Sequence, residues 1–276
     1  MTIPEYMVII LGGICLVLLV LRLCMGWTGI FYRRRGFDSG ASRTIGTREI
    51  QEDEYAILES QDGVMAVLAD GKGKHAGGKI ASHAAVEVFK EVFSDKNAFY
   101  NPQYYLRKAF QGANREILKL VEDGQGQASV AAVMIKDSRM YYAVVGNVKI
   151  AVYRNRELVP ITVGHTIDML ARKQYSEGKL SRQEAAALLE QHQLYNFVGQ
   201  DGFQDIEFFD TPITLRGGEY ILLMSDGLYE EVRWKDMEDC LEQEGTCQEK
   251  AYALVELVNQ SEAEDKDNAS VVILRL

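Results

Sequence analysis

The sequence is poor in the residue types that characterise nucleic-acid-binding, zinc-binding and disulfide-rich proteins. Acidic residues outnumber basic ones by 40 to 30, and a net charge of −10 excludes a nucleic-acid partner held by bulk electrostatics. The four cysteines have neither metal-ligand spacing nor the pattern of a disulfide framework. Only four prolines interrupt the 276 residues, and 47% are hydrophobic, which is enough to bury one sizeable core. The composition therefore indicates a globular protein that is held together by an apolar core rather than by disulfides or cysteine-bound metal ions.

One long apolar segment occupies residues 7–31 and is interrupted only by Arg22. It is long enough to cross a bilayer of about 30 Å as a helix. A cleaved signal peptide is disfavoured, because the residues before the apolar segment include Glu5 and no basic side chain. The triplet Arg33–Arg35 follows the segment, and the positive-inside rule then predicts an outside N-terminus and a cytoplasmic C-terminal part. We predict a single-pass cell-membrane protein with an anchor at residues 1–35, a polar linker at 36–43 and a soluble domain at 44–276.

Helical spacing and strand-like runs alternate along the soluble domain. Apolar residues at helical spacing predict helices over residues 81–92 and from Pro102 to about residue 120. Strand-like runs follow at residues 128–135, 140–145 and 149–153, with a hairpin turn at Asn155-Arg156. Residues 165–193 predict two helices that project as an insert, broken at Gly178, with Ser181 as the N-cap of the second.

Three further strand-like segments are each joined to an aspartate. Residues 64–69 run into Asp70, residues 219–225 run into Asp226, and residues 269–276 follow Asp267. A single Asp-Gly pair is ordinary turn chemistry, but its repetition favours a shared site. If these strands belong to one packed pair of sheets, the carboxylates converge and raise each other's pKa unless cations neutralise them. Oxygen ligands without a cysteine or histidine cluster indicate Mg²⁺ or Mn²⁺, and such sites suit phosphoryl chemistry.

Four short motifs occur in a fixed order: REIQED at 48–53, ADGKGKHAGG at 69–78, SDGL at 225–228 and DNASVV at 267–272. Together they resemble the metal-dependent Ser/Thr protein phosphatases of the PPM family (type 2C), bacterial branch. The resemblance implies an α+β fold of two packed antiparallel β-sheets flanked by helices, here preceded by one transmembrane helix. It also implies a binuclear centre of two Mn²⁺ or Mg²⁺ ions at one end of the sheets.

The resemblance implies a role for each residue that matches a family motif. Asp70 is expected to bridge both metal ions, and Arg48 to hold the substrate phosphate with its guanidinium fork. His75 is either a general acid or an ordinary loop histidine. The further metal ligands are expected to be Glu52, the Gly71 carbonyl, Asp226 and Asp267, with Asp53 and Asn268 in supporting positions.

The chain departs from the family pattern at several positions. Asn147 stands where the family has an aspartate that helps to bind an additional, weaker metal ion, so this extra site is expected to be weakened. Gln51 replaces the usual asparagine, a mild change. Lys72 and Lys74 are unusual in the metal-binding loop, where they either assist phosphate binding or are simply solvated.

The predicted function is metal-dependent hydrolysis of phosphoserine and phosphothreonine on proteins by a two-metal-activated water. The enzyme is predicted to act at the cytoplasmic face of the membrane. Its predicted partners are phosphorylated proteins, including a Ser/Thr kinase and its targets. One alternative is a catalytically inactive, membrane-tethered binding module, which the departures at Lys72, Lys74 and Asn147 would favour. Another is a P-loop nucleotide-binding protein, because residues 73–79 spell GxxxxGK, although Ile80 replaces the required hydroxyl residue.

Overall fold

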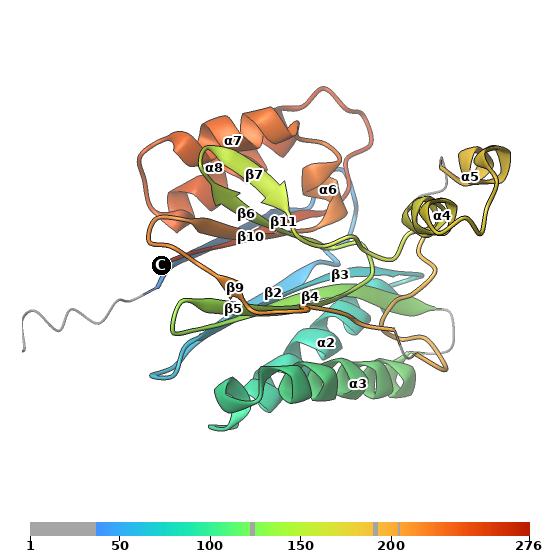
Figure 1. Cartoon of the computed structure of the whole chain (residues 1–276). Helices are drawn as coiled ribbons and strands as arrows, with labels where there is room; N and C mark the ends of the chain where they lie inside the picture. The colour runs from blue at the N-terminus through green and yellow to red at the C-terminus, as the bar shows by residue number, and fades with distance from the viewer. Residues whose placement is uncertain (1–36, 122–124, 190–192, 204) are drawn as a thin grey trace, which may run out of the picture. The chain divides into compact units, whose positions relative to one another are not determined.

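Two antiparallel β-sheets lie face to face in a computed structural model that describes residues 37–121, 125–189, 193–203 and 205–276 (Figure 1). In spatial order, the first sheet contains β1 (Asp38–Thr44), β11 (Ala269–Arg275), β10 (Tyr220–Met224), β6 (Lys149–Arg154) and β7 (Glu157–Pro160). The second contains β2 (Glu54–Glu59), β3 (Val64–Gly73), β4 (Gly126–Lys136), β5 (Arg139–Val145) and β8 (Glu207–Phe208), and β9 (Ile213–Thr214) also pairs with β5.

The alternation of side chains along each strand divides the apolar residues between two faces. In β3, Val64, Ala66 and Leu68 belong to the core between the sheets, whereas Met65 and Val67 belong to the core under the helices. The same division holds in the first sheet, where alternate residues of β11 contribute to different clusters. Every strand that is buried on both faces therefore reads as a nearly continuous apolar run.

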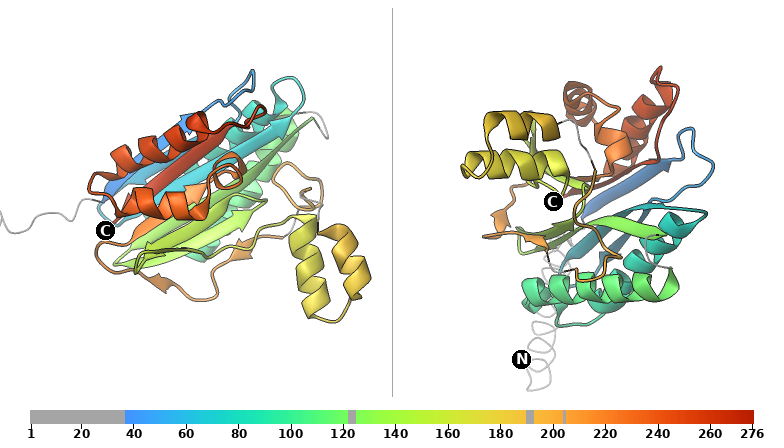
Figure 2. Two further views of the ribbon diagram at one scale, coloured as in Figure 1. Left: turned by 90° about the horizontal axis from the view of Figure 1, so that it is seen from above. Right: turned by 90° about the vertical axis from the view of Figure 1, so that its right-hand side faces the viewer.

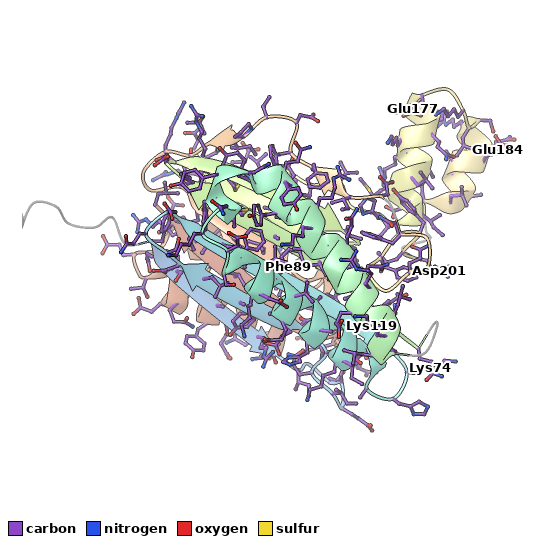
Figure 3. All side chains as sticks on the ribbon, turned by 90° about the horizontal axis from the view of Figure 1, so that it is seen from below. Lys74, Phe89, Lys119, Glu177, Glu184 and Asp201 are labelled. Atoms are coloured by element: carbon purple, nitrogen blue, oxygen red, sulfur yellow. The ribbon has the colours of Figure 1, made fainter. Side chains whose placement is uncertain are left out.

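Helices cover the outer face of each sheet, which gives four layers (Figure 2). The second sheet is covered by α2 (Gly77–Phe93) and α3 (Pro102–Leu120), which follow one another through the short η1 (Ala98–Tyr100). Phe89 of α2 is fully buried (Figure 3). It meets Phe110 of α3 edge to face, with ring centroids 5.0 Å apart. The first sheet is covered by α7 (Trp234–Glu242) and α8 (Cys247–Gln260).

The remaining helices lie near one end of the strands. The short α6 (Asp226–Tyr229) follows β10 directly, and α4 (Ile167–Ser176) and α5 (Arg182–Leu188) form the predicted insert to one side (Figure 1). Ser181 caps α5, as predicted, through a capping box with Glu184. The turn between β6 and β7 is also confirmed, because Asn155 and Arg156 both have positive φ, as a tight hairpin requires.

The predicted linker at residues 36–43 is wrong. Residues 38–44 form β1, which pairs along its whole length with β11. Its sequence DSGASRT lacks the alternating apolar pattern because it is an edge strand held largely by backbone hydrogen bonds. Gly40 allows α8 to approach, because a Cβ there would stand 2.3 Å from the backbone nitrogen of Gln248.

The predicted membrane anchor lies outside the described residues. Within the part of the chain that the structure describes, no helix combines the length and the apolarity needed to cross a bilayer. Residues 37–276 form a compact unit of their own. The two packed antiparallel sheets and their flanking helices confirm the predicted fold of this unit.

Candidate metal and phosphate site

The three aspartates predicted from strand ends do lie at one end of the two sheets. Asp70 is near the end of β3, Asp226 follows β10, and Asp267 precedes β11. β10 and β11 are antiparallel neighbours, so the end of one lies beside the start of the other. A cavity of about 670 Å³ opens here. It is lined by the predicted residues Arg48, Glu52, Asp70, Gly71, His75, Asp226, Asp267 and Asn268, but not by Asp53.

The carboxyl groups of Asp70 and Asp226 contact each other at the floor of this cavity. Burial and the negative charge of Asp226 raise the pKa of Asp70 well above its ordinary value, and a hydrogen bond joins the two side chains. Asp226 is also held by Asn147, whose Nδ2 donates to Asp226 Oδ2 at 2.8 Å. Asn147 is oriented in turn by Ser129 Oγ, which donates to its Oδ1 at 2.7 Å. The pair thus needs either a shared proton or a cation.

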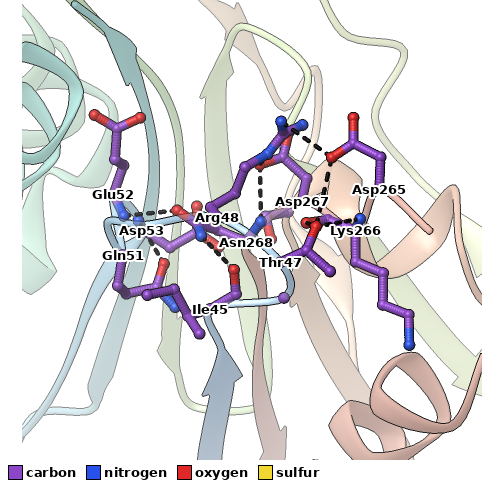
Figure 4. Close-up of polar contacts among 12 residues, drawn as sticks. Ile45, Thr47, Arg48, Gln51, Glu52, Asp53, Asp265, Lys266, Asp267 and Asn268 are labelled. Carbon is purple, nitrogen blue, oxygen red and sulfur yellow. Dashed lines mark hydrogen bonds and ion pairs between the residues drawn. The ribbon is translucent and has the colours of Figure 1, made fainter. Parts of the chain in front are cut away.

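Arg48 and Asp267 form a bidentate ion pair at the rim of the cavity (Figure 4). Arg48 Nε and Nη2 donate to the two Asp267 oxygens at 3.1 and 3.2 Å, and Nη1 lies 3.2 Å from Asp265 Oδ1. The hydrogen bond to Asp267 raises the pKa of Arg48, which stays cationic at all relevant pH. Two carboxylates balance the Arg48 charge in this arrangement, so its guanidinium fork can take up an anion once the pair with Asp267 opens.

Glu52 is held by the beginning of α2. The backbone N–H groups of Lys79 and Gly78 donate to its carboxylate and lower its pKa, although burial has the larger effect and leaves the pKa raised. The N-cap residue of α2 provides no side-chain cap, so Glu52 supplies the negative charge that the helix terminus favours. Gly78 makes room for it, because a Cβ there would lie 2.6 Å from Glu52 Oε1.

Asp53 and Asn268 support the site from behind. Asp53 is 2% exposed, accepts from Ser225 Oγ at 2.9 Å, and has a pKa raised by burial to about 7. Asn268 Oδ1 accepts from the backbone N–H of Glu52 at 2.7 Å, and its Nδ2 donates to the Ile45 carbonyl at 2.9 Å. Both residues therefore fix the loop that carries Arg48 and Glu52, and their supporting role at a metal centre stays a prediction.

Gly71 and His75 frame the loop that follows Asp70. A Cβ at Gly71 would stand 2.2 Å from the Gly78 carbonyl oxygen, so only glycine lets the end of β3 approach α2 this closely. His75 has a positive φ of 55° and lies exposed at the cavity wall. Its place is compatible with a general acid or a loop histidine, and its role stays a prediction.

The side chains of Asp70 and Asp226 are of a type that binds divalent cations. Their donors are all oxygens, and the Asp70–Asp226 contact places two half-buried carboxyl groups against each other. In the conformation of the described residues, no three acidic, histidine or cysteine side chains are arranged to hold one ion together. Asp267 pairs with Arg48 instead. The structure thus brings Asp70 and Asp226 into contact, and places Glu52 and Asp267 on the walls.

Sequence reasoning missed several residues that line the cavity. Ser129 and Gln127 lie on β4 directly opposite Asp70 and Lys72, a relation that only the strand register reveals. Leu194 and Phe197 form part of the wall after the α4–α5 insert. Their positions depend on contacts between distant segments, for which a single sequence carries no direct signal.

The alternative interpretation of residues 73–79 as a P-loop is wrong. The strand before it, β3, has antiparallel neighbours on both sides, β2 and β4, rather than the parallel neighbours of a nucleotide-binding α/β fold. The N–H groups at the start of α2, which would cradle a phosphate in a P-loop, instead bind the carboxylate of Glu52.

Comparison with known proteins agrees with this architecture. The family model of protein phosphatase 2C matches residues 41–260. The Ser/Thr phosphatase Stp of Listeria monocytogenes is 28% identical over 236 residues, which cover 82% of this chain and 90% of that protein. The Ser/Thr phosphatase structure from S. agalactiae has a TM-score of 0.75 at 24% identity and covers 87% of this chain and 99% of that one.

A second solved structure is the catalytic domain of the Ser/Thr protein phosphatase PstP in complex with two manganese ions. Its TM-score is 0.64 at 22% identity, over 87% of this chain and 97% of that one. At these identities the structural likeness establishes the fold, while the family model covers most of the chain. The chain therefore belongs to the protein phosphatase 2C family, and its predicted assignment to the protein Ser/Thr phosphatases is confirmed.

Proposed function

We propose that this protein hydrolyses phosphoserine and phosphothreonine in proteins with the help of two Mn²⁺ or Mg²⁺ ions. The observation that carries the proposal is the contact between Asp70 and Asp226 at the floor of a cavity with Arg48 at its rim. Two half-buried carboxyl groups held in contact favour a bound cation over two uncompensated negative charges. The fully oxygen-based donor set and the manganese-bound relative support the same assignment.

The ions would be held by Asp70, Asp226, Asp267, Glu52 and the Gly71 carbonyl. When bound, such ions supply an activated water and stabilise negative charge on a phosphoryl group. Arg48 binds the phosphate oxygens of the substrate, because its guanidinium is planar, permanently charged and already at the cavity mouth. Asn147 and Ser129 keep Asp226 oriented, and Asn268 keeps the loop of Glu52 in place.

The direct test uses the purified full-length chain in mild detergent. Hydrolysis of p-nitrophenyl phosphate and of a phosphothreonine peptide is measured with Mn²⁺, with Mg²⁺ and with EDTA. We expect metal-dependent turnover that falls at least about 100-fold in Asp226→Ala, while the fold, measured by circular dichroism, persists. Asp201→Ala is the matched control, because Asp201 is exposed on a loop and absent from the cavity wall (Figure 3).

The opposing result points to the inactive binding module. A folded wild-type chain that binds no Mn²⁺ in calorimetry and hydrolyses neither substrate would overturn the proposal. An Asp226→Ala protein with near-normal turnover would overturn the assignment of this site.

We also propose that residues 7–31 anchor the protein in the cell membrane with the catalytic unit on the cytoplasmic side. The apolar segment and the basic triplet after it support this placement. The substrates are then phosphoproteins near the membrane, such as a Ser/Thr kinase and its targets. Membrane fractionation tests the anchor: the full chain should sediment with membranes, and residues 37–276 alone should stay in the supernatant. Equal amounts of both in the supernatant would overturn it.

A further inference from the structure

Lys72 is a cationic side chain on the cavity wall whose role the motifs leave open. It lies two residues beyond Asp70 on β3 and lines the same cavity. Because alternate residues of a strand point to one face, Asp70 and Lys72 project to the same side. Their cross-strand partners on β4, Ser129 and Gln127, line the cavity as well.

The charge of Lys72 is uncompensated within the described part of the chain. No ion pair within 4.0 Å joins it to an acidic residue there, and its cross-strand neighbour Gln127 is neutral. Arg48, by contrast, is paired with Asp265 and Asp267. In a protein with a net charge of −10, an exposed lysine beside an acidic cavity provides a local attraction for negative charge.

Lys74 differs from Lys72 although both are exposed lysines only two residues apart. β3 ends at Gly73, and the backbone then turns, with the Lys74 N–H donating to the Gln125 carbonyl at 2.9 Å. Lys74 does not line the cavity, and it lies at the outer edge of the molecule in Figure 3. The strand geometry therefore separates one lysine that faces the cavity from one that does not.

The spacing between Lys72 and Asp70 along β3 matches the spacing between the phosphorylated residue of an extended substrate peptide and a residue close to it. Two residues along a strand span about 7 Å, and an extended peptide also advances about 3.4 Å per residue. A side chain one or two positions from the phosphorylated residue can thus reach the Lys72 ammonium when the phosphate lies at the site of Asp70 and Arg48.

We propose that Lys72 is a specificity-determining residue that selects phosphopeptides with an acidic residue next to the phosphoserine or phosphothreonine. The inference rests on the proposed phosphatase function and names its substrate class. The apolar part of the wall, formed by Ile50, Leu194 and Phe197, accommodates the uncharged portion of the same peptide.

The test compares matched phosphothreonine peptides with the full-length protein, Mn²⁺ and low salt. Each peptide carries either aspartate or asparagine one or two positions from the phosphothreonine, and the readout is the ratio of kcat/KM between the two. An exposed ion pair of this kind contributes a preference of about 1.4- to 5-fold. We expect this ratio in the wild type, a ratio near 1 in Lys72→Gln, and a ratio below 1 in Lys72→Glu.

Lys74→Gln is the matched control, and it should keep the wild-type ratio. The inference is overturned if the wild type shows no preference, if Lys72→Gln keeps it, or if Lys74→Gln loses it equally. It is also overturned if Lys72→Gln slows both peptides by the same factor, because the lysine then contacts the phosphate itself. p-Nitrophenyl phosphate has no flanking residue, so a wild type that hydrolyses it without any peptide preference refutes only this inference. A wild type that hydrolyses nothing refutes the proposed function as well.

Discussion

Asp70 illustrates how one half-buried side chain is arranged to bind a ligand at a cost in stability to the ligand-free protein. Its carboxyl group contacts that of Asp226, and burial together with this neighbour raises the pKa of Asp70. Such an arrangement destabilises the protein whenever both groups are ionised without a cation. Site residues of this kind break the ordinary rule that buried charges are paired, and the break is what reveals their function.

Asp70→Asn is expected to stabilise the metal-free protein while abolishing its response to metal. The amide can donate to Asp226 and removes one of two adjacent negative charges, so the free energy of unfolding at pH 7.5 rises by about 1–2 kcal/mol. The increase in unfolding temperature that Mn²⁺ causes in the wild type should disappear. Urea unfolding with EDTA and thermal unfolding with Mn²⁺ measure the two effects.

Asp201→Asn makes the same chemical change on an exposed loop and serves as the control. It should change stability by no more than about 0.5 kcal/mol and keep the Mn²⁺ response. An Asp70→Asn protein that is less stable without metal, yet still stabilised by Mn²⁺, would show that Asp70 is not a ligand.

At the scale of elements, the sequence predicted those structures whose signals are local. The apolar strands leading to Asp70 and Asp226, the helix from Pro102 and the insert with its Ser181 cap all follow from apolar spacing and turn chemistry, although β3 continues past Asp70 to Gly73. β1 was missed because an edge strand needs no apolar alternation, and α7 because it is a short, polar helix of nine residues. Each is stabilised by tertiary contacts rather than by its own sequence pattern.

The candidate site was predicted as a set of residues but not as a set of contacts. The motifs identify Arg48, Asp267 and Asp226, yet the pairing of Arg48 with Asp267 joins residues 219 apart in the chain. The hydrogen bond from Asn147 to Asp226 likewise joins the turn between β5 and β6 to the first residue of α6, after β10. Such contacts depend on strand register and sheet packing, which a single sequence does not specify.

The α4–α5 insert is joined to the site through His165. The residue is 5% exposed, its Nδ1 accepts from the Gly146 N–H at 3.0 Å, and its backbone N–H donates to the Gly146 carbonyl at 2.8 Å. The Tyr195 N–H, from the other end of the insert, donates to the His165 carbonyl at 3.0 Å. Since Nδ1 acts as an acceptor, the bond requires it to be unprotonated.

Acidification is therefore expected to destabilise the protein through His165. Burial lowers its pKa in the folded state below the ordinary 6.5, so the unfolded chain binds the proton first as the pH falls. The contribution of His165 to stability is full above pH 6.5 and is lost as the pH drops below it. Each pKa unit of lowering corresponds to about 1.4 kcal/mol. Urea unfolding at pH 7.5 and at pH 5.5 measures the difference.

His165→Asn separates this effect from the titration of other groups. Its side-chain oxygen can accept from the Gly146 N–H but does not titrate, so its loss of stability between pH 7.5 and 5.5 should be smaller than in the wild type. His83→Asn is the control, because His83 is exposed on α2 and its removal should keep the wild-type difference. Equal losses in the wild type and in His165→Asn would contradict the assignment.

At the scale of the whole molecule, β1 closes the edge of the first sheet and joins it to the helix layer. Gln248 of α8 contacts both backbone groups of Ala41, and Asp38 accepts from the Cys247 N–H at 3.1 Å. Without β1, the buried strand β11 would become an exposed, strongly apolar edge, which is a template for aggregation. The catalytic unit thus begins at β1 rather than after it.

A chain of residues 37–276 is accordingly expected to fold, and a chain of residues 45–276 is not. Loss of β1 removes a full strand pairing and its contacts with α8, so we expect the free energy of unfolding to fall by more than about 3 kcal/mol, as for large core truncations. Chemical unfolding and size-exclusion chromatography compare the two chains, and the shorter one should aggregate. If instead residues 45–276 stayed monomeric with the stability of residues 37–276, β1 would be a dispensable extension, and the boundary predicted from sequence at residue 44 would be restored.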